Sequence, residues 1–227
     1  MAPIGTLYIA NNNQVPGKVI RAVAAITGSE VTIASDYVHF ETNKKPEFLA
    51  KFAYGKVPAL ELTSGQTITE GIAIARYRRQ KQLLGTTVDE EALVDQWQNF
   101  TYTELQPRVL GLSALYSHAT PYNKQIEIST KDTTNRALEY LNSHLASHTF
   151  VATERLTVAD LALASILYGY FRIYIDAAAR TKWPNIQRYF ETVINQPKLK
   201  EVFGEPEYAE KAATYTAPTK EEKKAKA

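Results

Sequence analysis

The sequence predicts an α/β domain followed by an all-helical domain. Two patterns in the first 85 residues indicate the α/β part: a strand, a helix and a strand in succession, and then a hairpin. Beyond them, apolar residues recur at helical spacing, which predicts a helical bundle. We therefore expect one domain at residues 1–85 and a second at 86–215. The Lys-rich tail at 216–227 has no core-forming pattern, so we expect it to be disordered.

The strand–helix–strand unit opens the chain. Residues 6–9 place two aliphatic side chains on one face of a short strand. Pro16 suits the first turn of a helix, and Gly28 ends the apolar recurrence that follows it. A second strand at residues 31–34 completes the unit, and a short helix at 46–52 leads to the hairpin.

The hairpin contains the first candidate binding feature. Leu60 and Leu62 flank a polar residue, and a Ser-Gly turn follows them, as in a two-stranded hairpin. Pro58 stands at the head of the first strand, where a residue that cannot donate to the ladder is tolerated. If its bond to Val57 is cis, the backbone N–H and C=O of Val57 face outward and are available to an extended peptide.

A helix is expected to begin directly after the hairpin and to end near residues 84–85. Its first free backbone N–H groups belong to Glu70 and Gly71. Such a helix start carries partial positive charge and unpaired donors, which suit a carboxylate. Together with Val57 and Pro58, it predicts a cradle for a peptide carboxylate. The alternative is a simple helix start, because an acid in the first turn is common.

The second part of the chain predicts five helices. The first begins after Thr87 and ends at Pro107, with an apolar stripe made by Leu93, Val94, Trp97, Phe100 and Leu105. The others are expected at residues 109–116, 124–145, 157–179 and 186–195. Thr157 and Asp160 form a capping-box pattern before a near-continuous apolar run, which marks a buried central helix.

Composition excludes several functions. The chain has no cysteine, so disulfides, thiolate metal sites and a cysteine nucleophile are excluded. The net charge of +2 lies in the tail, where four lysines and two glutamates leave the remainder neutral, which argues against a general nucleic-acid surface. No stretch resembles a membrane span or a secretory signal. We expect a soluble cytoplasmic protein without membrane or nucleic-acid contacts.

Two histidines form a candidate metal pair. His144 and His148 are four residues apart and could share an ion. Because no acid stands beside the first histidine, a polar helix end is the better interpretation. We therefore expect no metal site.

The Val57-Pro58 pair before the hairpin and the Glu70-Gly71 pair after it resemble the glutathione site in the thioredoxin-like half of glutathione transferases. Within that superfamily, several segments are similar to the gamma subunit of eukaryotic translation elongation factor 1. These segments are residues 5–8, 42–52, 55–58, 119–124 and 195–197, together with the Lys-rich end. The resemblance covers residues 5 to about 215.

This resemblance implies a thioredoxin-like first domain, an all-α second domain and glutathione as a ligand or co-substrate. The residues that would bind glutathione are Lys56, Val57, Pro58, Glu70 and Gly71. In transferases the position of Gly71 is usually Ser or Ala, so the serine hydroxyl is missing here, and affinity should be weakened rather than abolished. Gamma subunits anchor the nucleotide-exchange subunits of elongation factor 1, so the implied partners are exchange subunits of the alpha or beta type. Transferases also usually form homodimers.

Catalysis is the open point. When the chain is placed in register with theta-like transferases, Asn13 occupies the position of their catalytic serine. The side-chain amide of Asn13 can donate to a glutathione thiolate, which would support weak transferase activity. Asn13 is an equally good N-cap for the following helix. Tyr8 lies mid-strand, so we expect it to pack rather than to act on sulfur. The rival function is a free-standing glutathione transferase or peroxidase that conjugates glutathione to small electrophiles. A third hypothesis is a glutathione-bound redox reporter without turnover.

Overall fold

A four-stranded mixed sheet forms the first part of the protein in the computed structural model, which describes residues 3–11, 14–77 and 81–218. The strand order is β2-β1-β3-β4, with β1 parallel to β2 and antiparallel to β3, and β3 antiparallel to β4. The strands are β1 (Gly5–Tyr8), β2 (Thr32–Ile33), β3 (Ala59–Leu62) and β4 (Thr67–Thr69). This arrangement confirms the predicted strand–helix–strand unit and hairpin.

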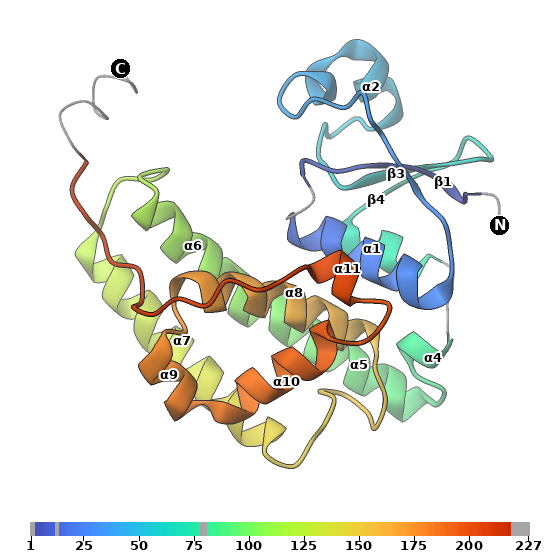
Figure 1. Ribbon diagram of the computed structural model, residues 1–227. Helices are drawn as coiled ribbons and strands as arrows, with labels where there is room; N and C mark the ends of the chain where they lie inside the picture. Colours follow the sequence, from blue (N-terminus) through green and yellow to red (C-terminus); the bar gives the residue numbers. More distant parts are fainter. Residues whose placement is uncertain (1–2, 12–13, 78–80, 219–227) are drawn as a thin grey trace.

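The two faces of the sheet are covered by different helices. Leu7 and Leu60 pack with α1 (Val15–Thr27) and α3 (Gly71–Arg76), in the cluster that also contains Ile20 and Ile74. Because side chains alternate along a strand, the neighbouring Tyr8 faces the other side. There it packs in a smaller cluster with α2 (Pro46–Lys51), which follows the short turn η1 (Thr42–Lys44). Figure 1 shows α1 below the sheet and α2 above it.

The second part is all-helical among the described residues. Its elements are α4 (Lys81–Leu84), α5 (Val88–Phe100), a π-helical turn η2 (Thr101–Leu105), α6 (Gln106–Tyr116), α7 (Lys124–Leu145), α8 (Val158–Ile173), α9 (Ala177–Lys182), α10 (Pro184–Ile194) and α11 (Lys200–Phe203). The predicted capping box is present at the start of α8: Asp160 Oδ2 accepts from the Thr157 N–H at 2.7 Å. The expected burial of α8 is also confirmed, because almost the whole helix is inaccessible to solvent.

Three helix predictions were wrong in detail. Pro107 does not end its helix, because η2 carries α5 directly into α6 and Pro107 falls in the first turn of α6, where a missing N–H is tolerated. Leu93 does not belong to the buried stripe, since it is 41% exposed. The helix expected at 157–179 is divided, because Asp176 caps a new helix by accepting from the Ala179 N–H at 2.9 Å. The helix expected at 71–84 appears as α3 and α4, and residues 78–80 between them lie outside the described part.

One core connects the two parts. Helix α1 packs against α8, and a continuous cluster of buried apolar residues extends from Leu7 in β1 to Phe203 in α11. Lys198 adds a polar link, since its Nζ donates to the Ile26 carbonyl at 3.2 Å. The sheet and the helices therefore share an apolar interior.

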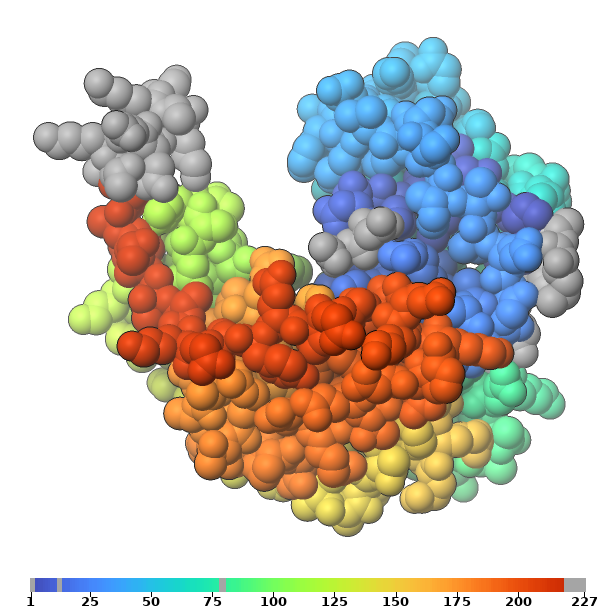
Figure 2. Space-filling model, in the orientation of Figure 1, coloured from blue at the N-terminus to red at the C-terminus, as the bar shows by residue number. Residues whose placement is uncertain are grey.

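The segment after α11 crosses the helical part in extended form (Figure 1), and the space-filling view shows it lying across the surface of these helices (Figure 2). The N–H groups of Ala209 and Ala213 donate to carbonyls at the end of α8, at 2.9 and 2.8 Å. Tyr215 then stacks on Tyr122 at 3.8 Å between ring centroids, and the His118 ring lies 2.7 Å from the Thr216 carbonyl. The predicted tail begins within this anchored segment, and its residues 219–227 lie outside the described part, so disorder there stays a prediction.

Candidate functional site

A hollow beside the first turn of α1 contains all five residues expected to bind glutathione. It holds about 220 Å³ and lies between the start of α1, the loop before β3 and the start of α3. Its lining includes Lys56, Val57, Pro58, Glu70 and Gly71. Residues that are distant in the sequence thus meet at one surface depression.

The Val57-Pro58 bond is cis, so the condition for Val57 to present backbone groups to a peptide is met. The Val57 N–H makes no hydrogen bond within the described residues, which leaves it open to a ligand. Its carbonyl is different, because the side-chain amide of Gln14 donates to it at 2.9 Å. The expectation that both groups of Val57 are free therefore holds for the N–H alone.

Gln14 is the functional residue that sequence reasoning missed. Its side-chain carbonyl accepts from the Ala10 N–H at 3.1 Å, while its amide nitrogen reaches Val57. The side chain thus spans from the loop after β1 to the cis-proline. A glutamine in a polar loop gives no sequence signal for this contact, because its partner is 43 residues away.

Glu70 and Gly71 adopt an unusual backbone at the start of α3. Glu70 has φ of 67°, in the left-handed region that non-glycine residues rarely occupy. A Cβ on Gly71 would lie 2.5 Å from Pro16 Cβ and 3.4 Å from Pro58 Cγ. The chain therefore needs glycine here for close packing of α1, α3 and the cis-proline. The first N–H groups of α3 remain without helical acceptors, as at any helix start.

Lys56 supplies a positive charge at the outer edge of the hollow. Its Nζ lies 5.6 Å from the centroid of the exposed Tyr54 ring, within the range of a cation–π contact. Lys56 and Glu70 are the charged residues in the described lining. The hollow thus offers a cation, a carboxylate and free backbone donors to a zwitterionic peptide.

Two residues, Asn13 and Tyr8, are candidates for activating the thiolate of glutathione. Asn13 lies outside the described residues, so its role stays a prediction. Tyr8 packs, as expected: its ring stands edge-on to Phe48 and Phe52, and its hydroxyl donates to Glu61 Oε2 at 3.1 Å. Burial raises the pKa of Tyr8, and the Glu61 carboxylate raises it further. The hydroxyl is engaged on the α2 face of the sheet.

The histidine pair lies at the end of α7 and contacts backbone. The His144 ring lies 2.8 Å from the Val151 carbonyl, and the His148 ring lies 2.8 Å from the His144 carbonyl. The two rings stack at 4.0 Å. Among the described residues, no group of three metal-ligating side chains is found. In the same part of the chain, no helix is long and apolar enough to cross a membrane.

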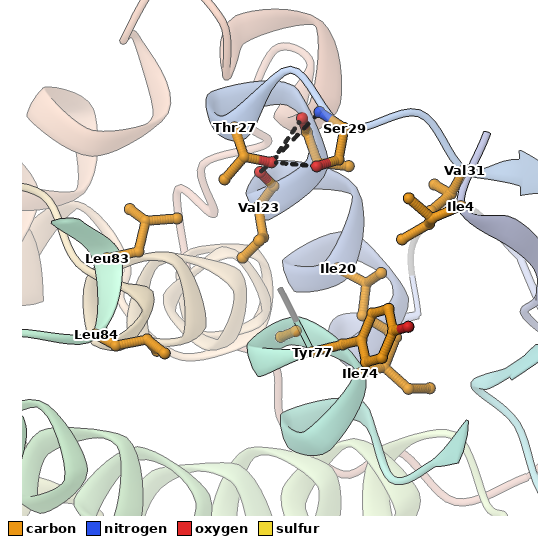
Figure 3. A pocket seen from close by; sticks show the side chains of 12 residues that line it. Ile4, Ile20, Val23, Thr27, Ser29, Val31, Ile74, Tyr77, Leu83 and Leu84 are labelled. Atoms are coloured by element: carbon orange, nitrogen blue, oxygen red, sulfur yellow. Dashed lines mark hydrogen bonds between the residues drawn. The ribbon is translucent and has the colours of Figure 1, made fainter. Parts of the chain in front are cut away.

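A second hollow lies behind α1 and is strongly apolar. Figure 3 shows Ile20 and Val23 of α1 and Ile74 and Tyr77 at α3 around it, with Thr27 bonded to the Val23 carbonyl at 2.8 Å. Its volume is only about 30 Å³, room for about one water molecule. It is therefore too small for glutathione.

Comparisons with known proteins identify the family. Residues 5–78 match the N-terminal domain of glutathione S-transferases, and residues 107–197 match their C-terminal domain. The two matches lie on the sheet part and on the helical part. The chain belongs to the glutathione transferase family.

Within that family the chain is similar to elongation factor 1-gamma. It is 35% identical to the Equus caballus protein over 216 residues, and 35% identical to the Artemia salina protein over 218 residues. These matches cover 94% and 93% of this chain and 49% of each relative, so the chain spans about half the length of the curated relatives it matches.

Solved structures agree with this similarity. The GST-like domain of elongation factor 1-gamma from Saccharomyces cerevisiae has a TM-score of 0.82 at 27% identity, covering 94% of this chain and 99% of that one. The glutathione transferase URE2P6 from Phanerochaete chrysosporium, solved with oxidized glutathione, has a TM-score of 0.77 at 20% identity, covering 89% and 96%. At 20% identity, the similarity to URE2P6 supports only the assignment of the fold.

Proposed function

We propose that this chain is a glutathione transferase-like scaffold in translation elongation, which anchors exchange subunits of elongation factor 1 and binds glutathione. The observation that carries the proposal is the 35% identity to elongation factor 1-gamma over 94% of the chain. The proposal includes a cytoplasmic location, a homodimer and a domain boundary at residues 85–86.

The glutathione part rests on the chemistry of the hollow beside α1. The open Val57 N–H suits the peptide backbone of the ligand, and the free N–H groups at Gly71 suit its γ-glutamyl carboxylate. Lys56 would attract the glycyl carboxylate, and Glu70 the ammonium group. The transferase alternative gains no support from Tyr8, whose hydroxyl is bonded to Glu61.

Calorimetric titration with reduced and S-alkylated glutathione tests this part. We expect saturable binding that Lys56→Met weakens, with the exposed Lys124→Met on α7 as the matched control. The absence of binding at millimolar ligand, weaker than about −4 kcal/mol, would exclude the glutathione site. Turnover of a generic electrophile by the wild type, lost in Asn13→Ala, would support the transferase alternative instead.

The scaffold part is tested by binding of the intact chain to purified exchange subunits of the alpha and beta type. No binding at micromolar concentration would contradict it.

We expect the helical part to supply much of the contact surface, where Leu93 and Tyr140 are exposed near Trp97. Leu93→Asp with Tyr140→Asp should abolish binding, whereas the exposed Phe40→Asp on the sheet part should retain it. The opposite pattern would assign the surface to the sheet part. Point substitutions are preferred to removal of residues 1–85, because α1 and α8 share a core.

A further inference from the structure

A buried lysine without an acidic partner lies on α1. Lys18 is only 3% exposed, and its Nζ lies 3.9 Å from the centroid of the Tyr168 ring and 5.7 Å from that of Phe203. Within the described residues, no carboxylate lies within ion-pair distance of this ammonium group. A buried charge is costly unless it is paired, so lysines are almost never fully buried alone.

The charged neighbours of Lys18 are themselves cations. Burial, followed by the positive charges of Arg21 and Arg172, lowers the pKa of the Lys18 ammonium to about 8. Because this pKa still exceeds 7, Lys18 stays largely protonated at neutral pH. Arg21 and Arg172 therefore add positive potential at Lys18, whereas Glu205 and Glu207 act on the Tyr168 ring that it contacts. A negative charge placed between Lys18 and Arg172 would be stabilised by both cations.

Lys18 lines a hollow at the junction of the two parts of the protein. The hollow holds about 150 Å³ between α1, α6 and α8, and Arg172 and Ser113 also line it. Its remaining lining is mainly apolar, with Val109 and Ile166 among the residues. This hollow is close to the candidate glutathione hollow, because Val15 lines the former and the adjacent Pro16 lines the latter. The two are distinct, since they share no lining residue.

We propose that this hollow binds a small oxyanion, a phosphate or carboxylate group, between Lys18 and Arg172. Lys18 acts as a desolvated point charge, and the guanidinium of Arg172 at the exposed edge offers paired donors that match oxyanion geometry. The volume of about 150 Å³ is below the roughly 300–1,000 Å³ usual for drug-sized ligands. It therefore suits inorganic phosphate, acetate or a comparably small anionic metabolite. The proposal is independent of glutathione binding.

The test is a titration of the intact chain with phosphate, acetate and chloride at constant ionic strength. Two signals are followed: the NMR resonances of the Lys18 side chain and the melting temperature. We expect a saturable shift and a higher melting temperature with phosphate or acetate but not with chloride. Whichever of the two acts at lower concentration identifies the oxyanion class.

Three variants assign the effect. Lys18→Met keeps the apolar stem and removes the charge, so the gain in melting temperature should disappear. Arg172→Gln should weaken oxyanion affinity about tenfold or more, whereas Lys124→Met should leave it unchanged. The proposal is overturned if neither oxyanion shifts the Lys18 resonances, or if Lys18→Met shows the same gain as the wild type. Lys18 would then be held by Tyr168 and Phe203 alone. If Lys18→Met does not fold, the proposal is tested by the shift of the Lys18 resonances in the wild type and by the oxyanion affinity of the exposed Arg172→Gln variant.

Discussion

The side-chain amide of Gln14 donates at 2.9 Å to the carbonyl oxygen of Val57, a residue that lines the candidate glutathione hollow. The same side chain accepts from the Ala10 N–H at 3.1 Å. One residue therefore joins the loop after β1 to the cis-proline. A peptide ligand that donates to Val57 must share this carbonyl with Gln14 or displace it.

Gln14→Ala should raise glutathione affinity by up to about tenfold, because the ligand no longer competes for the Val57 carbonyl. The free energy of unfolding should fall by about 1–3 kcal/mol, since two hydrogen bonds of roughly 0.5–1.5 kcal/mol each are lost. Calorimetric titration and urea unfolding measure the two effects, with the exposed Gln125→Ala as control. Weaker glutathione binding in Gln14→Ala would mean that Gln14 contacts the ligand directly.

Gly71→Ser should not restore a tighter transferase-like site. Its Cβ would lie 2.5 Å from Pro16 Cβ, and overpacking of this kind typically costs about 1–3 kcal/mol. We expect a lower midpoint of urea unfolding and no gain in glutathione affinity. The matched control is Gly111→Ala on α6, where a Cβ meets nothing within 4 Å. That variant should be neutral or more stable by up to about 1 kcal/mol. A stable Gly71→Ser variant with improved affinity would contradict the packing argument.

Glu127→Gln should destabilise the protein at neutral pH and much less at acidic pH. The Glu127 carboxylate accepts from Lys131 at 2.6 Å, from Tyr122 at 2.7 Å and from Tyr116 at 2.9 Å. These donors, Lys131 first, lower the pKa of Glu127 to about 2 from its usual 4.5. A depressed folded-state pKa stabilises the protein above the unfolded pKa, and this stabilisation is lost as pH falls from about 4.5 toward 2.

Urea unfolding of the wild type and of Glu127→Gln at a series of pH values measures this effect. At pH 7 the loss should be about 2 kcal/mol, as for hydrogen bonds to a charged group. The difference between the two proteins should shrink below pH 4.5. The exposed Glu154→Gln serves as control. A difference that stays constant with pH would contradict the assignment to Glu127.

Thr157→Ala should cost about 1 kcal/mol by removing the cap of α8. Thr157 is fully buried, and its hydroxyl donates to Asp160 Oδ2 at 2.8 Å. The half-buried Thr192 is the control, because its hydroxyl bonds only within α10, to the Arg188 carbonyl, and Thr192→Ala should be close to neutral. Thermal unfolding of the two variants measures the difference, and equal losses would exclude a specific capping contribution.

Features set by neighbouring residues could be predicted from the sequence. The hairpin around Leu60 and the capping box at Thr157 each depend on a few adjacent side chains, and both are present. The division of the helix at Asp176 is also local, but the uninterrupted apolar pattern concealed it.

Features that depend on tertiary contacts could not be predicted. The partner of Gln14 is distant in the sequence, and the need for glycine at position 71 arises only when Pro16 packs against it. The burial of Lys18 likewise follows from the position of α8, since nothing adjacent on α1 distinguishes it from a solvated lysine. The sequence thus named five residues that the structure brings to one hollow, but it did not predict the contact of Gln14 with Val57.

The core shared by α1 and α8 has a consequence for the heredity of this protein. Recombination that separated the two parts near Gly85 would expose an apolar surface on each fragment. Both fragments would then be prone to aggregate. The halves can therefore diverge on their outer faces but must be inherited as a pair. A substitution on the inner face of α1 must therefore fit the surface that α8 presents to it, whatever role the outer surfaces have.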